Sequence, residues 1–151
     1  MAKKLTVADR AYVAGFLDGE GTVGCNVSRT TLGWTPYLRV AFANYDDSVL
    51  RLIKKLWGGS LSEQKSGVWA LHLNGAEAAQ LCRDVFKFCI IKKEAVGLSI
   101  KMYSHHNDRK MRIHYAIEIM ESTRRGYRAV RSRVNLDRMI DEYTKMSQIV
   151  A

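Results

Sequence analysis

The sequence has few residues of the kinds that interrupt or cross-link a chain. It contains one proline and three cysteines in 151 residues, and it has no low-complexity tract and no Gly/Ser-rich linker. A chain of this length without a linker is typical of one domain, so we expect a single domain over residues 1–151. A hydrophobic fraction of 47% can form a substantial core and excludes a disordered chain.

Long apolar runs are also absent. No stretch approaches the roughly 18 consecutive apolar residues that span a bilayer. Near the N-terminus, Asp9 and Arg10 interrupt any apolar segment of the kind found in an export signal. We therefore expect no membrane partner and an intracellular protein, either in the cytoplasm or nucleoid of a prokaryote or in an organelle.

The cysteines match no C-x-x-C spacing. Cys25, Cys82 and Cys89 are an odd number, and we expect them to be reduced and buried as small hydrophobic residues. A cysteine–histidine metal site that includes His105 and His106 is the alternative.

Acidic residues are outnumbered, with 15 Asp and Glu against 24 Lys and Arg, which gives a formal net charge of +9. The excess is largest in residues 101–133, where nine basic residues face three acidic ones. Such an excess on helices is often only a solvated face. Because the whole chain is basic, we favour a surface that holds phosphates and therefore a nucleic-acid partner.

A helix is predicted near the N-terminus. Thr6, followed three residues later by Asp9, is typical of a capping box. Apolar residues recur at helical spacing from Tyr12 to Leu17, and Gly19 and Gly21 end the run. The small residues on another face would let a second helix approach closely, although ordinary packing within the domain is an alternative. These small residues are Ala11, Ala14, Gly15 and Gly19.

Two β-hairpins are predicted after this helix, each followed by another helix. Alternation over 22–31 and 37–44 surrounds a turn at 33–36, and alternation over 60–64 and 68–73 surrounds a turn at 65–67. The helices begin at Asp46 or Asp47 and at Asn74, where Glu77 suggests a second capping box.

The pattern predicts an α+β fold in the order αββαββα. It has a four-stranded antiparallel sheet with helices on one face, and further helices near 92–103, 108–121 and 123–147, with a possible break at Gly126.

The outer face of the predicted sheet is polar but carries little charge. A solvated surface is the commoner explanation. Side chains of this type also hydrogen-bond to base edges, and a two-stranded ribbon fits the major groove of DNA. The candidate DNA contacts are Asn26, Ser28, Thr30, Tyr37, Arg39, Ser62, Gln64 and His72.

The segment 13–21, Val-Ala-Gly-Phe-Leu-Asp-Gly-Glu-Gly, resembles the LAGLIDADG motif of homing endonucleases. In that family two motif helices pack about a two-fold axis, and members with one motif act as homodimers. Since this chain has one motif, the resemblance implies a homodimer on double-stranded DNA with a long, roughly palindromic site. The expected dimer contacts are Ala11, Ala14, Gly15 and Asp18; Asp18 is also expected to bond backbone at the helix end.

The resemblance places a metal-binding carboxylate at Glu20, with the carbonyl of Gly19 as a further ligand. Mg²⁺ prefers such oxygen ligands, and Mn²⁺ or Ca²⁺ are expected to substitute for binding. A solvated carboxylate is the plain alternative. However, a carboxylate at the C-terminal end of a helix faces an unfavourable dipole, which favours a compensating cation.

Two further catalytic candidates come from the same resemblance. Lys92 corresponds to a basic residue near the cleaved phosphate, although a surface lysine is nearly as good an interpretation. Asp46 lies where relatives place a polar side chain that organises solvent, although an N-cap role alone would explain it.

The implied function is a Mg²⁺-dependent, sequence-specific DNA endonuclease of the intron-homing type. It would make a double-strand break with short 3′ overhangs. Two alternatives keep the same fold: an RNA-binding splicing maturase, and a catalytically inactive DNA-binding protein.

Overall fold

The computed structural model describes residues 4–123 and 130–149 and has an α+β fold. Its order confirms the predicted αββαββα pattern followed by C-terminal helices, while the expected break at Gly126 lies outside the described residues. The elements are α1 (Val7–Glu20), β1 (Gly21–Thr30), β2 (Gly33–Asn44), α2 (Ser48–Trp57), β3 (Ser60–Glu63), β4 (Trp69–Asn74), α3 (Gly75–Val85), η1 (Phe86–Phe88), α4 (Lys93–Ser104), α5 (Arg109–Ser122) and α6 (Val130–Gln148).

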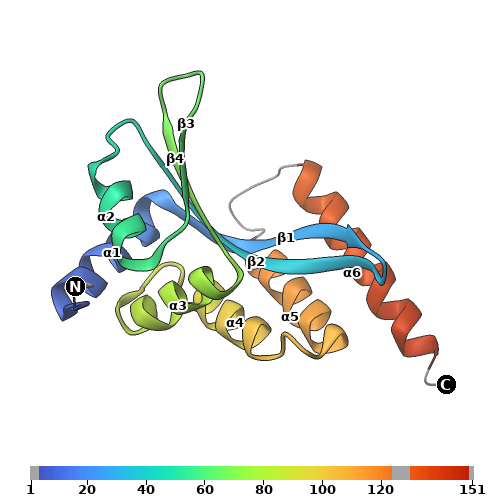
Figure 1. The fold of residues 1–151 in the computed structure, drawn as a ribbon. Coiled ribbons are helices and arrows are strands. Elements are labelled where there is room, and N and C mark those ends of the chain that lie inside the picture. The colour runs from blue at the N-terminus through green and yellow to red at the C-terminus, as the bar shows by residue number, and fades with distance from the viewer. Residues whose placement is uncertain (1–3, 124–129, 150–151) are drawn as a thin grey trace.

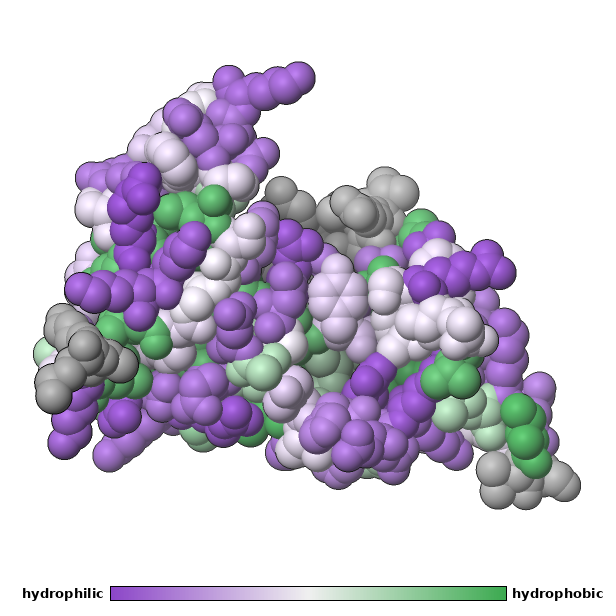
Figure 2. Space-filling model, in the orientation of Figure 1, coloured by the Kyte–Doolittle hydropathy of each residue, from purple (hydrophilic) through white to green (hydrophobic). Residues whose placement is uncertain are grey.

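The four strands form one antiparallel sheet in the order β1-β2-β4-β3. Figure 1 shows α3, α4 and α5 side by side beneath the sheet, and α6 at the end formed by the tip of the β1–β2 hairpin. The β3–β4 hairpin rises from the other end. In Figure 2 this raised hairpin stands above the rest of the molecule, and its surface is mainly hydrophilic or neutral.

The core lies between the inner face of the sheet and the helices. Every second residue of the central strands is buried there, including Leu38, Val40 and Phe42 of β2. The inner face of β4 adds Leu71 and Leu73. Each such side chain stabilises the fold by about 1.5–3 kcal/mol on burial. The alternate residues of the same strands therefore point to the opposite face.

The start of α1 confirms the predicted capping box. The hydroxyl of Thr6 accepts the N–H of Asp9 at 3.0 Å, and the Asp9 carboxylate accepts the N–H of Thr6 at 3.0 Å. At its other end α1 passes directly into β1. A Cβ at Gly21 would lie 2.5 Å from Cδ1 of Leu17, so a side chain at this tight junction would force Leu17 to move.

The predicted faces of α1 need correction. Tyr12, expected in the apolar stripe, is 55% exposed, whereas Ala14, expected at the dimer contact, is fully buried in the core. Val13, Ala14 and Leu17 form the buried face. Ala14 is thus turned into its own subunit, on the same side of the helix as Asp18 one turn later, and not toward the open side on which Gly15 lies.

The first turn was also predicted wrongly. The strands are joined at Thr31–Leu32, and β2 already begins at Gly33, which has a φ of 107°. Pro36 therefore lies within a strand. It is tolerated because β4 pairs with β2 only from Arg39 onward, so Pro36 faces one neighbouring strand rather than two.

The later helix starts differ in detail from the prediction. Asn74 occupies the N-cap of α3 but makes no side-chain capping bond, so the second capping box is wrong. Glu77 instead lies against Gly58, where a Cβ would collide with it. Asp47 occupies the N-cap of α2, while Asp46 bonds to Ser48. Within the described ranges, no helix is both long enough and apolar enough to cross a bilayer.

Candidate metal site and nucleic-acid face

The C-terminal end of α1 presents a carboxylate and free carbonyl groups. Glu20 is exposed and forms no hydrogen bond or ion pair with another described residue, and the last turn of α1 has no basic residue. The carbonyl of Leu17 accepts the N–H of Gly21, and the carbonyl of Asp18 accepts Nζ of Lys92 at 2.5 Å. The carbonyls of the following two residues have no partner within the helix. Hard oxygen donors therefore gather at the negative end of a helix dipole.

Asp18 fixes a distant segment to this end of α1. Its carboxylate accepts the N–H groups of Ile90, Ile91 and Lys92 at 2.7, 3.2 and 2.9 Å. Burial raises the pKa of Asp18, but these three donors and the Lys92 charge outweigh it, so that the pKa is lowered. The expectation that Asp18 bonds backbone is confirmed, although the backbone belongs to residues 90–92.

The other two catalytic candidates lie toward the same end. Lys92 is bonded to the residue two positions before Glu20. Gly21 pairs with Phe42, so the end of β2 lies beside the start of β1, and Asp46 follows four residues later. Oδ1 of Asp46 accepts both the hydroxyl and the N–H of Ser48, and these bonds lower the pKa of Asp46.

An open stripe of small residues runs along α1. A Cβ at Gly15 or Gly19 would have no atom within 4 Å, and Ala11 is exposed. Beside the end of this helix, Ile90 and Ile91 are 84% and 77% exposed. Surface of this kind can accept another backbone at close range.

The strand register brings the eight candidate DNA contacts to one face. Asn26 pairs with Tyr37, and Arg39 with Asn74. None of the eight belongs to the buried core. Ser28 and Thr30 continue this face along β1, His72 lies on β4, and Ser62 and Gln64 lie on and just after β3.

Sequence reasoning missed two members of this outer face. Thr35 pairs with Ser28 and contacts the hydroxyl of Thr30 at 3.1 Å, but the misplaced turn concealed it. Asn74 was interpreted only as a helix cap. Extending the alternation by two residues before Tyr37 and by one residue after Leu73 would have found both.

His72 is the titratable histidine of the outer face. Burial, together with the nearby Arg39 charge, lowers the pKa of His72, so its imidazole is neutral at pH 7. Its Nδ1 is buried and has no hydrogen-bond partner among the described residues. A neutral imidazole in this position can accept or donate a hydrogen bond at a base edge.

The three cysteines are unpaired, as expected. Cys82 and Cys89 are buried, and the partly buried Cys25 donates its S–H toward the carbonyl of Ala116 at 3.7 Å. Burial raises the pKa of Cys25 and of Cys82 to about 12. The neighbouring His105 and His106 bond to backbone carbonyls of α4, and no cluster of metal ligands occurs in the described part of the chain.

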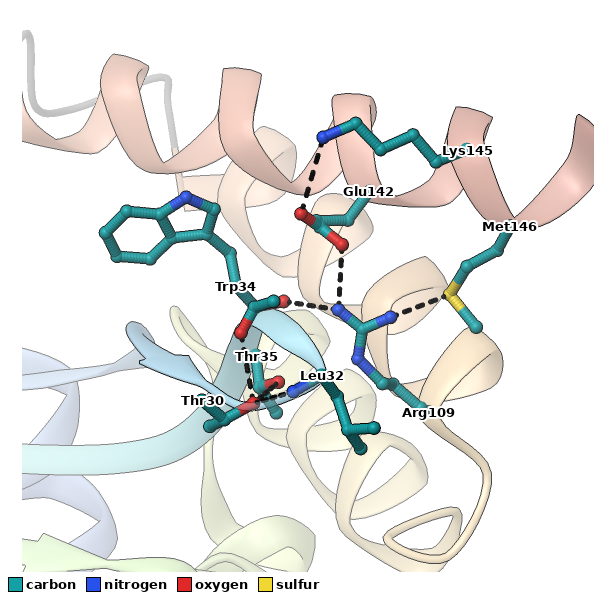
Figure 3. Close-up of polar contacts among 9 residues, drawn as sticks. Thr30, Leu32, Trp34, Thr35, Arg109, Glu142, Lys145 and Met146 are labelled. Carbon is teal, nitrogen blue, oxygen red and sulfur yellow. Dashed lines mark hydrogen bonds and ion pairs between the residues drawn. The ribbon is translucent and has the colours of Figure 1, made fainter.

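Two arginines of the basic C-terminal region serve the fold rather than phosphates. Arg109 donates to Glu142 at 2.8 Å and to the carbonyl of Trp34 at 2.9 Å, which ties α5 and α6 to the β1–β2 tip (Figure 3). This hydrogen bond lowers the pKa of Glu142, whose exposed fraction is 8%. Arg112 donates to the carbonyl of His106. These two residues are therefore removed from the predicted phosphate clamp, part of which lies outside the described residues.

Comparison with protein families decides the relationship. Residues 13–89 match the family model of the LAGLIDADG endonucleases. The chain belongs to the LAGLIDADG endonuclease family. The match begins in the segment that resembles the motif and extends through both hairpins, α3 and η1. A comparison with curated proteins finds no match.

Solved structures of LAGLIDADG homing endonucleases share the fold. I-CvuI, solved with its target in the presence of Ca, has a TM-score of 0.71 at 13% identity over 89% of this chain and 94% of its own. The archaeal, intron-encoded I-Vdi141I complexed with DNA has a TM-score of 0.68 at 17% identity over 89% and 96%. I-SmaMI bound to cleaved DNA has a TM-score of 0.62 at 18% identity over 87% of this chain but 47% of its own.

Proposed function

We propose that this LAGLIDADG protein is a divalent-metal-dependent DNA endonuclease that acts as a homodimer. The observation that carries the proposal is the exposed carboxylate of Glu20 at the end of α1, which has no partner among the described residues and lies next to an open stripe of small residues. In a two-fold dimer formed through that stripe, two such carboxylates would approach each other.

The donors at this site suit a hard cation such as Mg²⁺. The carboxylate of Glu20 and the carbonyl of Gly19 are oxygen ligands, and Mg²⁺ typically uses one or two protein carboxylates with water and phosphate oxygens for the rest. One chain offers too few ligands for an all-protein cage, which is consistent with a site completed by a second subunit and by DNA. When bound, a divalent cation polarises a phosphate and lowers the pKa of a water molecule.

The remaining groups would position the phosphate and the water. Lys92 Nζ would leave the carbonyl of Asp18 and place positive charge beside the phosphate, where negative charge develops. Asp46 has its Oδ1 occupied by Ser48, and its other oxygen would orient a water molecule. Asp18 would keep Lys92 in reach by holding its backbone N–H.

The dimer would place two sheets on one duplex. Each outer face carries the polar residues from Asn26 to His72, and a sheet surface with such side chains fits the major groove. The comparison with I-SmaMI supports a dimer, because one copy of this chain covers 47% of the longer I-SmaMI chain. The contacts proposed for the subunit interface are Ala11, Gly15 and Gly19, with Asp18 at the margin.

Cleavage of a plasmid library that carries random inserts tests the proposal. Wild-type protein, Glu20→Gln and the control Glu121→Gln are incubated with Mg²⁺, and the cut ends are sequenced. Glu121 is exposed at the end of α5 and belongs to no part of the proposed site. We expect wild type and Glu121→Gln to cut the same sites, and Glu20→Gln to bind the recovered duplex without cutting it.

Two results would reject the endonuclease. Binding of duplex DNA without cleavage by wild type would indicate a catalytically inactive DNA-binding protein. Binding of structured RNA in preference to any duplex DNA would indicate a maturase.

A further inference from the structure

A hollow of about 270 Å³ lies at the free edge of β1, between the β1–β2 hairpin and α6. Its lining is Asn26, Val27, Tyr37, Val134, Asn135 and Arg138. Asn26 and Tyr37 are register partners on the outer face of the sheet, so the hollow is continuous with the proposed DNA surface. It is mainly polar, and none of the described residues that line it carries a carboxylate.

Arg138 provides the positive charge of this hollow. Its guanidinium carbon lies 3.8 Å from the ring centroid of Trp34, in a cation–π contact. One N–H of Arg138 donates to Oδ1 of Asn135 at 3.4 Å. Arg138 forms no ion pair with any described carboxylate. A guanidinium has five N–H donors, so most of the donors of Arg138 are available to a ligand.

Trp34 is itself held in place, which fixes the position of Arg138. The carbonyl of Trp34 accepts Arg109, and Arg109 is neutralised by Glu142 of α6 (Figure 3). The two arginines therefore differ in role: Arg109 is paired and structural, whereas Arg138 has no ion-pair partner among the described residues and borders the hollow. Stacking on a fixed indole reduces the entropy that an arginine loses when it binds a ligand.

We propose that this hollow binds one phosphate diester of the DNA backbone at the flank of each half-site, with Arg138 as the main ligand. The inference rests on the proposed function, because DNA must lie on the outer face for its backbone to pass the β1 edge. A planar guanidinium matches two phosphate oxygens, and the neighbouring Asn and Tyr side chains supply neutral donors. The contact fixes the register of the protein on the duplex without reading its sequence.

The salt dependence of DNA binding tests the proposal. Fluorescence anisotropy with the duplex selected by wild type, in Ca²⁺ to prevent turnover, gives the affinity at several KCl concentrations. Loss of one phosphate contact per subunit should reduce the slope of log K against log salt by about 1.8 per dimer in Arg138→Gln. The control Lys101→Gln removes an equal charge from an exposed position of α4, beneath the sheet, and should leave the slope unchanged.

Three further measurements separate binding from folding. Arg138→Lys keeps the charge and should keep the slope. It loses the planar guanidinium that stacks on the indole and should bind DNA about two- to fivefold more weakly. Phosphate-ethylation interference should lose one position per half-site with Arg138→Gln. Thermal unfolding of both variants verifies that α6 is still docked.

Each negative outcome has a distinct meaning. If wild type binds no duplex, the proposed function fails. If wild type binds and Arg138→Gln matches Lys101→Gln in slope and interference pattern, the phosphate site is rejected and the proposed function stands. A slope change that occurs with an RNA hairpin but not with duplex DNA also overturns the site.

Discussion

Asp18 joins two segments that are more than 70 residues apart in the sequence. Its two carboxylate oxygens accept three backbone N–H groups of residues 90–92, and the carbonyl of the same residue accepts the ammonium of Lys92. One residue therefore sets the position of a proposed catalytic lysine relative to Glu20. The sequence offered Asp18 as a backbone-bonding residue, but it could not identify the partner, because the contact depends on how α3 and η1 turn the chain back.

Replacement of Asp18 by Asn should destabilise the protein by about 1–2 kcal/mol, the scale of a partly exposed hydrogen bond to a charged group. An amide has one acceptor oxygen and would direct an NH₂ group at a backbone donor. Urea unfolding at pH 7 measures the change. The control Asp141→Asn, at an exposed position of α6, should lie within 0.5 kcal/mol of wild type, roughly the usual range at surface sites.

The same pair of variants predicts a pH dependence. Because the pKa of Asp18 is lowered in the folded state, its contribution to stability is complete above the ordinary value of 3.8 and is lost as the pH falls through the lower folded value. The stability difference between wild type and Asp18→Asn should therefore shrink in acid. An equal difference at pH 7 and at pH 2.5 would contradict this origin.

Helix α1 shows which features of an element are local and which are not. The capping box of Thr6 and Asp9 was predictable because both partners lie within one helical turn. The face of Ala14 was not, since small residues occur on both sides of the helix and only the packed sheet selects one. The prediction of a turn at 33–36 was wrong for a related reason. Pro36 is tolerated in β2 because β4 does not extend to it, and the number of residues over which two strands pair is set by the tertiary structure.

Leucine substitutions on the two faces of α1 should have opposite effects on the subunit. Ala14→Leu overpacks a fully buried position and should cost about 1–3 kcal/mol at any protein concentration. Gly15→Leu enters open space and improves helix propensity by roughly 0.8 kcal/mol, so the dissociated subunit should be no less stable. Urea unfolding at low concentration gives both values, and sedimentation should show that Gly15→Leu weakens association. Equal destabilisation by the two variants would mean that the Gly15 face is packed within the subunit.

At the scale of the molecule, the parts of the site that follow from alternation were predictable and the parts that depend on distant packing were not. The outer-face residues from Asn26 to His72 were found because side chains of a strand alternate. The hollow beside Arg138 needs α6 to lie against the β1–β2 hairpin, about a hundred residues earlier in the chain. No periodicity in the sequence encodes that contact.

The exposed isoleucines beside α1 predict a concentration-dependent stability. If they are covered in the homodimer, the wild-type melting temperature should rise with protein concentration, because association stabilises the folded state. The double substitution of Ile90 and Ile91 by Ser should remove this dependence. Ile149→Ser is the matched control, since Ile149 is also 84% exposed but lies at the end of α6. Persistence of the dependence in the double variant would place the interface elsewhere.

The junction at Gly21 has a consequence for redirecting such a protein to other targets. Helix α1 continues into β1 without a loop. The proposed metal ligand Glu20 and the strand proposed to contact the bases are therefore consecutive in the chain. Exchanging side chains on the outer face of the sheet would change which DNA sequence is bound. It would leave unchanged the distance from the contacted bases to the position of cleavage. An added residue at the junction that shifted β1 by one position would instead turn every outward side chain of that strand toward the core.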